Sequence, residues 1–326
     1  MLDRLWAEGV SIDDRADIEA ARVRSIPLRL DDELALFAAW LAADEAHTSG
    51  IDSSITERLT GDVAAELLIL AIELRAAMHR RDHAAMDLAL TAIDPRLADA
   101  PGYPRRATAR AAAEIALAEA ALYNQDLETA RHCLDPVSAS GPTAFRIAAL
   151  VRHVTVALAR PDLEIAQTRA RQALMLARQE QRPMQAEQAQ LLYGLVAYLA
   201  GDVEAMRSTL QPLVDEKSGK PVVPLLAAGI AGPEQALARI AQGVQIASER
   251  GDAAGFALCA LVGARHHVAE NRRADALLAM SSVRVRLGGH APQVAAVLDA
   301  ELLAWRHAWG ASAFADAERA AIARLA

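Results

Sequence analysis

Residues 193–214 read YGLVAYLAGDVEAMRSTLQPLV, and this stretch decides how the chain folds. Its apolar residues recur at helical spacing on both sides of a two-residue break, Gly201 and Asp202, and a small residue, Gly194, stands seven positions before that break. Apolar residues three or four positions apart line one face of an α-helix, and a glycine followed by aspartate favours a helix end followed by a new helix start. The stretch therefore predicts a hairpin of two helices.

The same plan recurs along the chain. Its breaks are RD at 81–82, QD at 125–126, PD at 161–162 and NR at 271–272. Two less regular copies follow the same plan, one with its break near residues 231–235 and a degenerate one over residues 292–326. Successive breaks lie about 30 to 45 residues apart, which is the range of solenoids built from paired helices.

Burial explains why such hairpins would stack. A hairpin of two amphipathic helices has apolar residues on two faces, so one hairpin cannot cover them and a neighbouring hairpin must. The aspartates at the breaks, Asp126, Asp162 and Asp202, are suited to accept hydrogen bonds from the free backbone N–H groups that begin the second helix. The sequence thus predicts capped helix pairs stacked in order along the chain.

These segments resemble tetratricopeptide repeats (TPR). That family places a small residue seven positions before the break, an alanine five positions after it, and an aromatic residue or leucine four positions further on. Ala118, Ala130 and Leu134 fit all three positions. The family's early tryptophan is absent, and alanine stands where its first-helix tyrosine would be. The long helices are similar to those in the repeat domains of large bacterial transcription regulators.

The resemblance implies an all-α fold, a right-handed superhelical solenoid of about six to seven antiparallel helix pairs. We expect the TPR-like repeat array to cover residues 61–326 and residues 1–60 to form an N-terminal helical cap or an extra hairpin. The apolar side of residues 31–48, with Leu34, Phe37, Trp40 and Leu41, fits a helix in that N-terminal part.

Composition and charge narrow the class of protein. Apolar residues make up 53% of the chain and aromatic residues only 4%, which is typical of helices that approach closely over small side chains. The net charge of −8 disfavours nucleic acid as a partner. No apolar run is long enough to insert into a membrane, and no signal peptide is evident, so we expect a cytoplasmic protein. Abundant arginine with only two lysines indicates a bacterial, GC-rich origin.

The residues that could carry chemistry have simpler interpretations. His79 and His83 stand four apart but straddle a break, so we interpret them as surface histidines and expect no metal site. Asp13 and Asp14 are interpreted as caps at a helix start, and Cys133 and Cys259 as buried free thiols. We therefore predict no enzyme and no cofactor, although a repeat array can assemble a site from residues far apart in sequence.

In a TPR array the first helices of successive pairs line the concave side. The resemblance therefore implies a partner-binding groove on the first helices. The residues predicted to line it are Arg75, Met78, His79, Glu119, Tyr123, Thr155, Tyr198 and Arg265. An alternative for the two tyrosines is that they pack in the core against the next hairpin.

The leading functional hypothesis is a non-catalytic adaptor or scaffold that binds a partner peptide or helix of another protein in this groove. The alternative is a regulatory sensor domain that binds a small ligand and controls association. The final amphipathic stretch, residues 311–326, could cap the array or pair with a second copy, so a homo-oligomer stays open.

Overall fold

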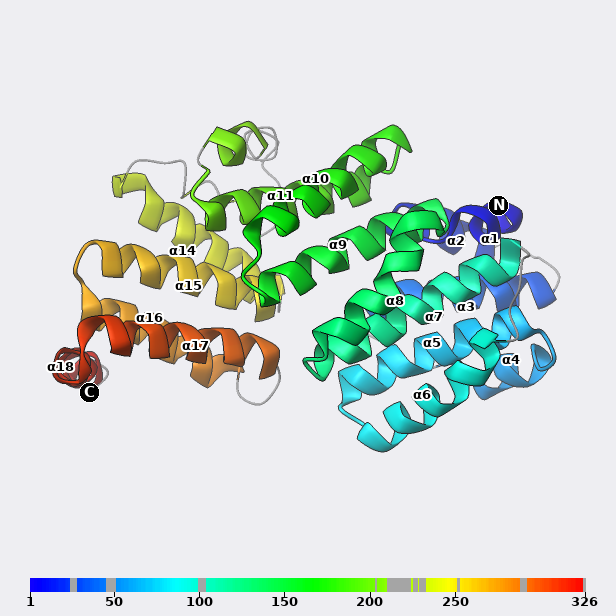
Figure 1. The fold of residues 1–326 in the computed structure, drawn as a ribbon, viewed down its shortest axis with the longest axis horizontal. Coiled ribbons are helices and arrows are strands. Elements are labelled where there is room, and N and C mark those ends of the chain that lie inside the picture. Colours follow the sequence, from blue (N-terminus) through cyan, green and yellow to red (C-terminus); the bar gives the residue numbers. More distant parts are fainter. Residues whose placement is uncertain are drawn as a thin grey trace. The chain divides into compact units, whose positions relative to one another are not determined.

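The computed structural model describes residues 1–23, 28–44, 51–98, 104–202, 204–209, 224, 228, 233–250, 253–287 and 292–324. Every regular element in these ranges is helical (Figure 1). The chain divides into two compact units, Met1–Val196 and Ala197–Ala326. Among the described helices, none combines the length and the apolar character needed to cross a bilayer.

The N-terminal part of the first unit consists of short and medium helices. These are α1 (Leu2–Glu8), the 3-10 turn η1 (Ile12–Asp14), α2 (Arg15–Arg22), α3 (Leu28–Asp44) and α4 (Ser53–Arg58). On α3 the predicted apolar side is buried, with Leu34, Phe37, Trp40 and Leu41 in the same core cluster as residues of the helices that follow. The division at residue 60 stays a prediction.

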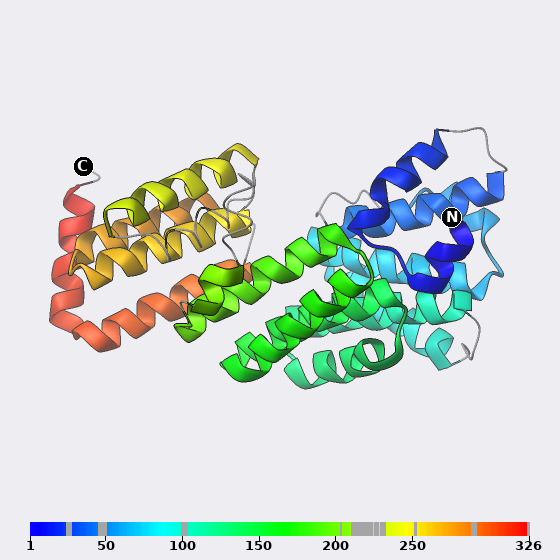
Figure 2. The same ribbon diagram turned by 90° about the horizontal axis from the view of Figure 1, so that it is seen from above.

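Longer helices then follow in pairs. They are α5 (Val63–Arg80), α6 (His83–Ala98), α7 (Pro104–Tyr123), α8 (Leu127–Ser140), α9 (Thr143–Ala159), α10 (Leu163–Gln179) and α11 (Pro183–Ala200), whose last residues belong to the second unit. Consecutive helices from α5 to α10 pack on one another, and the first helices α5, α7 and α9 are neighbours in that order (Figure 2). This is the packing that stacked hairpins require.

The turns within the pairs are the predicted breaks, and their aspartates cap the second helices. Asp126 accepts a hydrogen bond from the Thr129 backbone N–H at 3.0 Å, and Asp162 accepts one from Ile165 at 3.1 Å. Asp82 and Asp202 do the same for Ala85 and Ala205, each at 3.0 Å. At Arg81, Gln125 and Asn271 the backbone takes the left-handed conformation, with φ of 57°, 61° and 60°. That conformation ends a helix and lets the next one turn back.

The start of the chain is held by the start of α11, an arrangement that we call the N-terminal clamp and define by Glu8, Asp13, Asp14 and Arg182. Arg182 Nη1 donates to Asp14 Oδ2 at 2.8 Å and its Nη2 donates to Glu8 Oε2 at 2.9 Å. Asp13 accepts the backbone N–H groups of residues 184 and 185 at 2.6 and 3.1 Å. Asp14 forms a capping box with Ser11, whereas Asp13 caps a distant helix, α11.

In the second unit the described helices are α14 (Pro233–Arg250), α15 (Ala253–Ala269), α16 (Arg273–Leu287), α17 (Pro292–Trp309) and α18 (Ala311–Ala323). The break predicted near residues 231–235 lies partly outside the described residues, and α14 begins at Pro233. The break at 271–272 does separate α15 from α16. The core of these helices includes Met280, Val283, Leu298 and Trp305.

Burial agrees with the repeat pattern. Ala118, Ala130 and Leu134, which fit the three positions of the repeat, are completely buried. Small residues at these positions let neighbouring helices approach closely, while the leucine fills the remaining space. Both cysteines are free: Cys259 is buried, and Cys133 is half-buried, where burial raises the pKa of its thiol to about 11. The prediction of an all-α, TPR-like solenoid of helix pairs is confirmed.

Candidate functional site

Four side chains from alternate helices of the first unit, α3, α5, α7 and α9, contact one another in a row, which we call the first-helix row. It consists of Trp40 on α3, Arg75 on α5, Glu119 on α7 and Arg152 on α9. Two of the predicted groove residues lie at its centre: Arg75 Nε donates to Glu119 Oε2 at 2.7 Å. The repeat register explains this meeting, because both residues stand six positions before the left-handed residue that ends their helix.

Arg75 is enclosed by protein. Its side chain is only 3% exposed, and its Nη1 donates to the Trp40 carbonyl oxygen at 3.2 Å. The guanidinium carbon lies 4.3 Å from the centroid of the Trp40 ring, a cation–π contact. A buried charge needs such partners, because without them its loss of hydration would not be offset.

Glu119 lies between two arginines. Besides Arg75 it accepts a hydrogen bond from Arg152 Nε at 2.6 Å. Burial raises the pKa of the Glu119 carboxyl, but the positive charges and hydrogen bonds of Arg152 and Arg75 outweigh that effect and hold the pKa below its usual value. The carboxyl is therefore ionised at neutral pH, and the two arginines and one glutamate together carry one positive charge.

The row is not fully covered. Glu119 and Arg152 keep 20% and 18% of their side chains exposed, so both can be reached from solvent. Thr155, one turn after Arg152 on the same helix, is exposed, and its role in a groove stays a prediction. On α5, His79 is also exposed and its Nε2 lies 2.8 Å from the Ala43 carbonyl oxygen.

The other predicted residues of this unit are more deeply placed. Met78 is half-buried and packs against the core. Tyr123 is also half-buried against that core, and its ring centroid lies 6.3 Å from that of His83. A half-buried position fits the core alternative for Tyr123, and it also fits the edge of a binding surface. The groove roles of Met78 and Tyr123 therefore stay predictions.

In the second unit, Tyr198 and Arg265 are grouped with a residue that the sequence did not single out. Arg265 holds Glu301 of α17 through two hydrogen bonds, Nε to Oε1 at 2.9 Å and Nη2 to Oε2 at 2.8 Å. Tyr198 is half-buried, and its hydroxyl pKa is raised by burial, lowered by the charge of Arg265 and raised by that of Glu301, with a net increase. Tyr198, Arg265 and Glu301 thus form a polar cluster in the second unit, separate from the first-helix row.

Three members of these clusters, Trp40, Arg152 and Glu301, were missed by the sequence reasoning. Trp40 was assigned only to the apolar side of its helix. Arg152 stands one turn before the predicted groove residue Thr155. Residues one turn apart lie on the same face of a helix, so a search of the adjacent turn would have identified Arg152. Glu301 lies in the degenerate last copy, where no register can be read from the sequence.

His79 and His83, which were interpreted as surface histidines, are both exposed. His79 contacts the end of α3 and His83 faces Tyr123, so the two rings have different neighbours. Over the part of the chain that the structure describes, no three or more histidine, cysteine, aspartate or glutamate side chains are placed to share a metal ion.

A scan of protein-family models and a search of curated proteins give no match to this sequence. Among solved structures the chain is similar to the Rap conjugation gene regulator of the plasmid pLS20, determined in complex with the Phr* peptide. The two chains share 12% sequence identity with a TM-score of 0.51, and the match covers 97% of this chain and 90% of the other. At this identity the similarity concerns the fold alone. Together with the capped helix pairs, it establishes that this chain has a TPR-like helical repeat fold.

Proposed function

We propose that the protein is a non-catalytic adaptor that binds a peptide or helix of a partner protein along the first helices of its first unit. The observation that carries this proposal is the first-helix row, in which Glu119 and Arg152 are fixed in place and still partly exposed. Side chains that are already ordered lose little conformational entropy when a partner binds. The protein that shares the fold was determined with a bound peptide, which supports the same class of ligand here.

The chemistry of the row favours a partner that can exchange hydrogen bonds with both signs of charge. Glu119 offers acceptor oxygens, and Arg152 offers donors held in a fixed direction. Exposed His79 and Thr155 flank them and provide further polar contacts. We infer that the protein acts in the bacterial cytoplasm.

Selection from a peptide display library tests this proposal without knowledge of the natural partner. We expect the full chain to enrich a family of related peptides. The variant Thr155→Arg should no longer bind them, because the long arginine side chain would cover Glu119 and Arg152 of the first-helix row. Gln172→Arg is the matched control, since Gln172 is exposed on the second helix α10. Peptides that bind both variants equally, or no enriched family at all, would contradict the proposal.

The second candidate is a regulatory sensor domain that binds a small ligand and controls association. A specific feature favours ligand binding in the first unit, namely a cavity lined by arginines at the starts of α3 and α7 and at the end of α4.

A further inference from the structure

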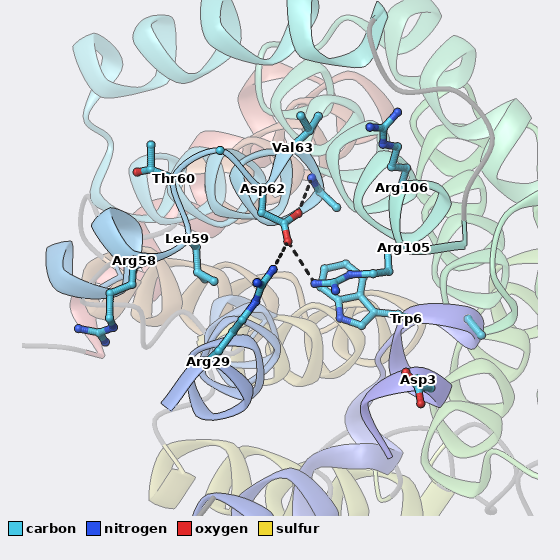
Figure 3. Close-up of a pocket in the computed structure, with 13 residues that line it drawn as sticks. Asp3, Trp6, Arg29, Arg58, Leu59, Thr60, Asp62, Val63, Arg105 and Arg106 are labelled. Carbon is cyan, nitrogen blue, oxygen red and sulfur yellow. Dashed lines mark hydrogen bonds and ion pairs between the residues drawn. The ribbon is translucent and has the colours of Figure 1, made fainter. Parts of the chain in front are cut away.

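A cavity of about 920 Å³ lies in the first unit, away from the first-helix row, where helices α3, α5 and α7 begin (Figure 3). Four arginines line it: Arg29 near the start of α3, Arg58 at the end of α4, and Arg105 and Arg106 in the first turn of α7. The Trp6 ring of α1 lies against the Arg105 guanidinium. The volume falls in the range of sites that hold small molecules.

Acidic side chains hold the arginines and offset their charge. Asp62 accepts hydrogen bonds from Arg29 and Arg105, each at 3.3 Å, as Figure 3 shows. Arg105 also donates to Glu33 at 2.8 Å, and Asp32 takes two hydrogen bonds from Arg58. Asp3 is a further acid in the lining. The side chains alone therefore come close to neutrality.

The starts of α3 and α7 add positive potential, whereas the start of α5 is capped by Asp62, which accepts from the backbone N–H groups of Ala64 and Ala65. Helices α3, α5 and α7 have 17, 18 and 20 residues, and all three begin at the cavity. The start of each helix carries the equivalent of roughly half a positive charge. The starts of α3 and α7, beside balanced side chains, leave a surplus of positive potential that favours an anion.

Two of the arginines retain donors that the protein does not use well. The Arg29 side chain is 68% exposed, and its hydrogen bond to Asp62 is long, at 3.3 Å. Arg105 Nε is buried and finds no hydrogen-bond partner among the described residues. The Arg105 guanidinium is kept in position by the Trp6 ring, whose centroid lies 4.7 Å away. The Arg105 side chain as a whole is 40% exposed, and its hydrogen bonds to Glu33 and Asp62 both use Nη2, so Nη1 is the group that can donate to a ligand oxygen.

We propose that this cavity binds a small ligand with two or more anionic groups, either phosphates or carboxylates, and that Arg29 and Arg105 are its main donors. The ligand's oxygens would accept from the free N–H groups of these two side chains. The inference is independent of peptide binding at the first-helix row, and it gives the sensor alternative a defined site.

Isothermal titration of the full chain with inorganic pyrophosphate and, separately, with citrate tests the proposal at constant ionic strength. We expect saturable binding of at least one probe at one site. Arg29→Gln and Arg105→Gln should each weaken that binding at least tenfold. Arg131→Gln is the matched control, because Arg131 is an exposed arginine on α8, outside the cavity, and should leave binding unchanged.

The two probes distinguish the sources of the anionic groups: binding of pyrophosphate alone indicates a phosphate ligand, and binding of citrate alone a carboxylate ligand. Binding of neither probe, or equal binding by wild type and Arg29→Gln, overturns the proposal. If Arg105→Gln fails to fold, the exposed Arg29 decides the outcome. If Arg29→Gln still enriches the same peptides, then peptide binding at the first-helix row is independent of anion binding in the cavity.

Discussion

Arg75 in the first unit and Arg265 in the second occupy the same position of the repeat, six residues before the left-handed residues Arg81 and Asn271. Their surroundings differ greatly. The Arg75 side chain is 3% exposed and contacts Trp40 and Glu119 from the helices on both sides. The Arg265 side chain is 39% exposed and is held by one glutamate, Glu301.

The difference shows that the position in the repeat determines where an arginine lies, whereas its neighbours determine how much it contributes to the stability of the fold. A charge enclosed on both sides depends on every partner, because removing one leaves the others buried and unpaired. A half-exposed pair has water as an alternative partner and contributes little. Position in the repeat alone therefore does not identify the residues that bind a ligand.

The largest effect should come from Arg75→Ala. It leaves the Glu119 carboxylate with one arginine fewer and removes the cation–π contact to Trp40, so we expect the free energy of unfolding of the first unit to fall by about 3 kcal/mol. Urea titration followed by peptide-resolved hydrogen exchange would measure it. Arg131→Ala, at an exposed position on α8 whose acidic partner Glu128 is also exposed, is the control. A loss equal to that of the control would remove the contrast with Arg265.

Glu119→Gln should have the next largest effect, about 2 kcal/mol at neutral pH, because hydrogen bonds to a charged group are lost. The folded pKa of Glu119 lies below its unfolded value of 4.5, so its stabilisation is present above pH 4.5 and is lost as pH falls through the folded pKa. The difference between wild type and variant should therefore shrink in acid. Unfolding curves at a series of pH values check this, and a constant difference would argue against an ionised Glu119.

Arg265→Ala should cost the second unit about 1 kcal/mol or less, because the ion pair with Glu301 is partly exposed. Arg265→Lys keeps the charge but not the two parallel hydrogen bonds, and so separates geometry from charge. Trp305 and Trp309 give a fluorescence signal from this unit for the measurement. A loss as large as that of Arg75→Ala would mean that the two arginines are equivalent after all.

The smallest effect should be that of salt. In about 1 M NaCl the screening length falls to about 3 Å, which weakens exposed pairs more than buried ones. The cost of Arg265→Ala should then fall by about 0.3 kcal/mol, while the cost of Arg75→Ala stays the same. Repeating both unfolding titrations at low and high salt compares the two sites, and equal salt sensitivity would contradict the difference in burial.

Local rules predicted most of the fold. The aspartates at the breaks cap helices because capping needs only a short stretch of chain, and the small residues of the repeat are buried because stacking requires it. The same register brought Arg75 and Glu119 together. Arg152 escaped notice because it reaches Glu119 from one turn away, and Trp40 because an aromatic ring in an apolar stripe looks like core.

Contacts between distant segments could not be read in this way. Asp13 was interpreted as a cap of its own helix, yet it caps α11. Arg182, which binds Asp14, stands in the turn between α10 and α11, a turn that the repeat pattern did not mark. The arginines of the cavity belong to the starts of α3 and α7 and the end of α4, which are brought together only by folding. Such pairings depend on the whole packing, and no short pattern encodes them.

The N-terminal clamp also has a consequence for synthesis. Asp13 and the backbone that it caps are 171 residues apart. A ribosome adding roughly 5–20 residues per second needs roughly 10–35 s to make that stretch, so the clamp cannot close until α11 begins to emerge, although α1 can already pack on α3 and α7. During this interval Asp13 and Asp14 lack the backbone N–H groups and the Arg182 guanidinium that they hold in the folded chain.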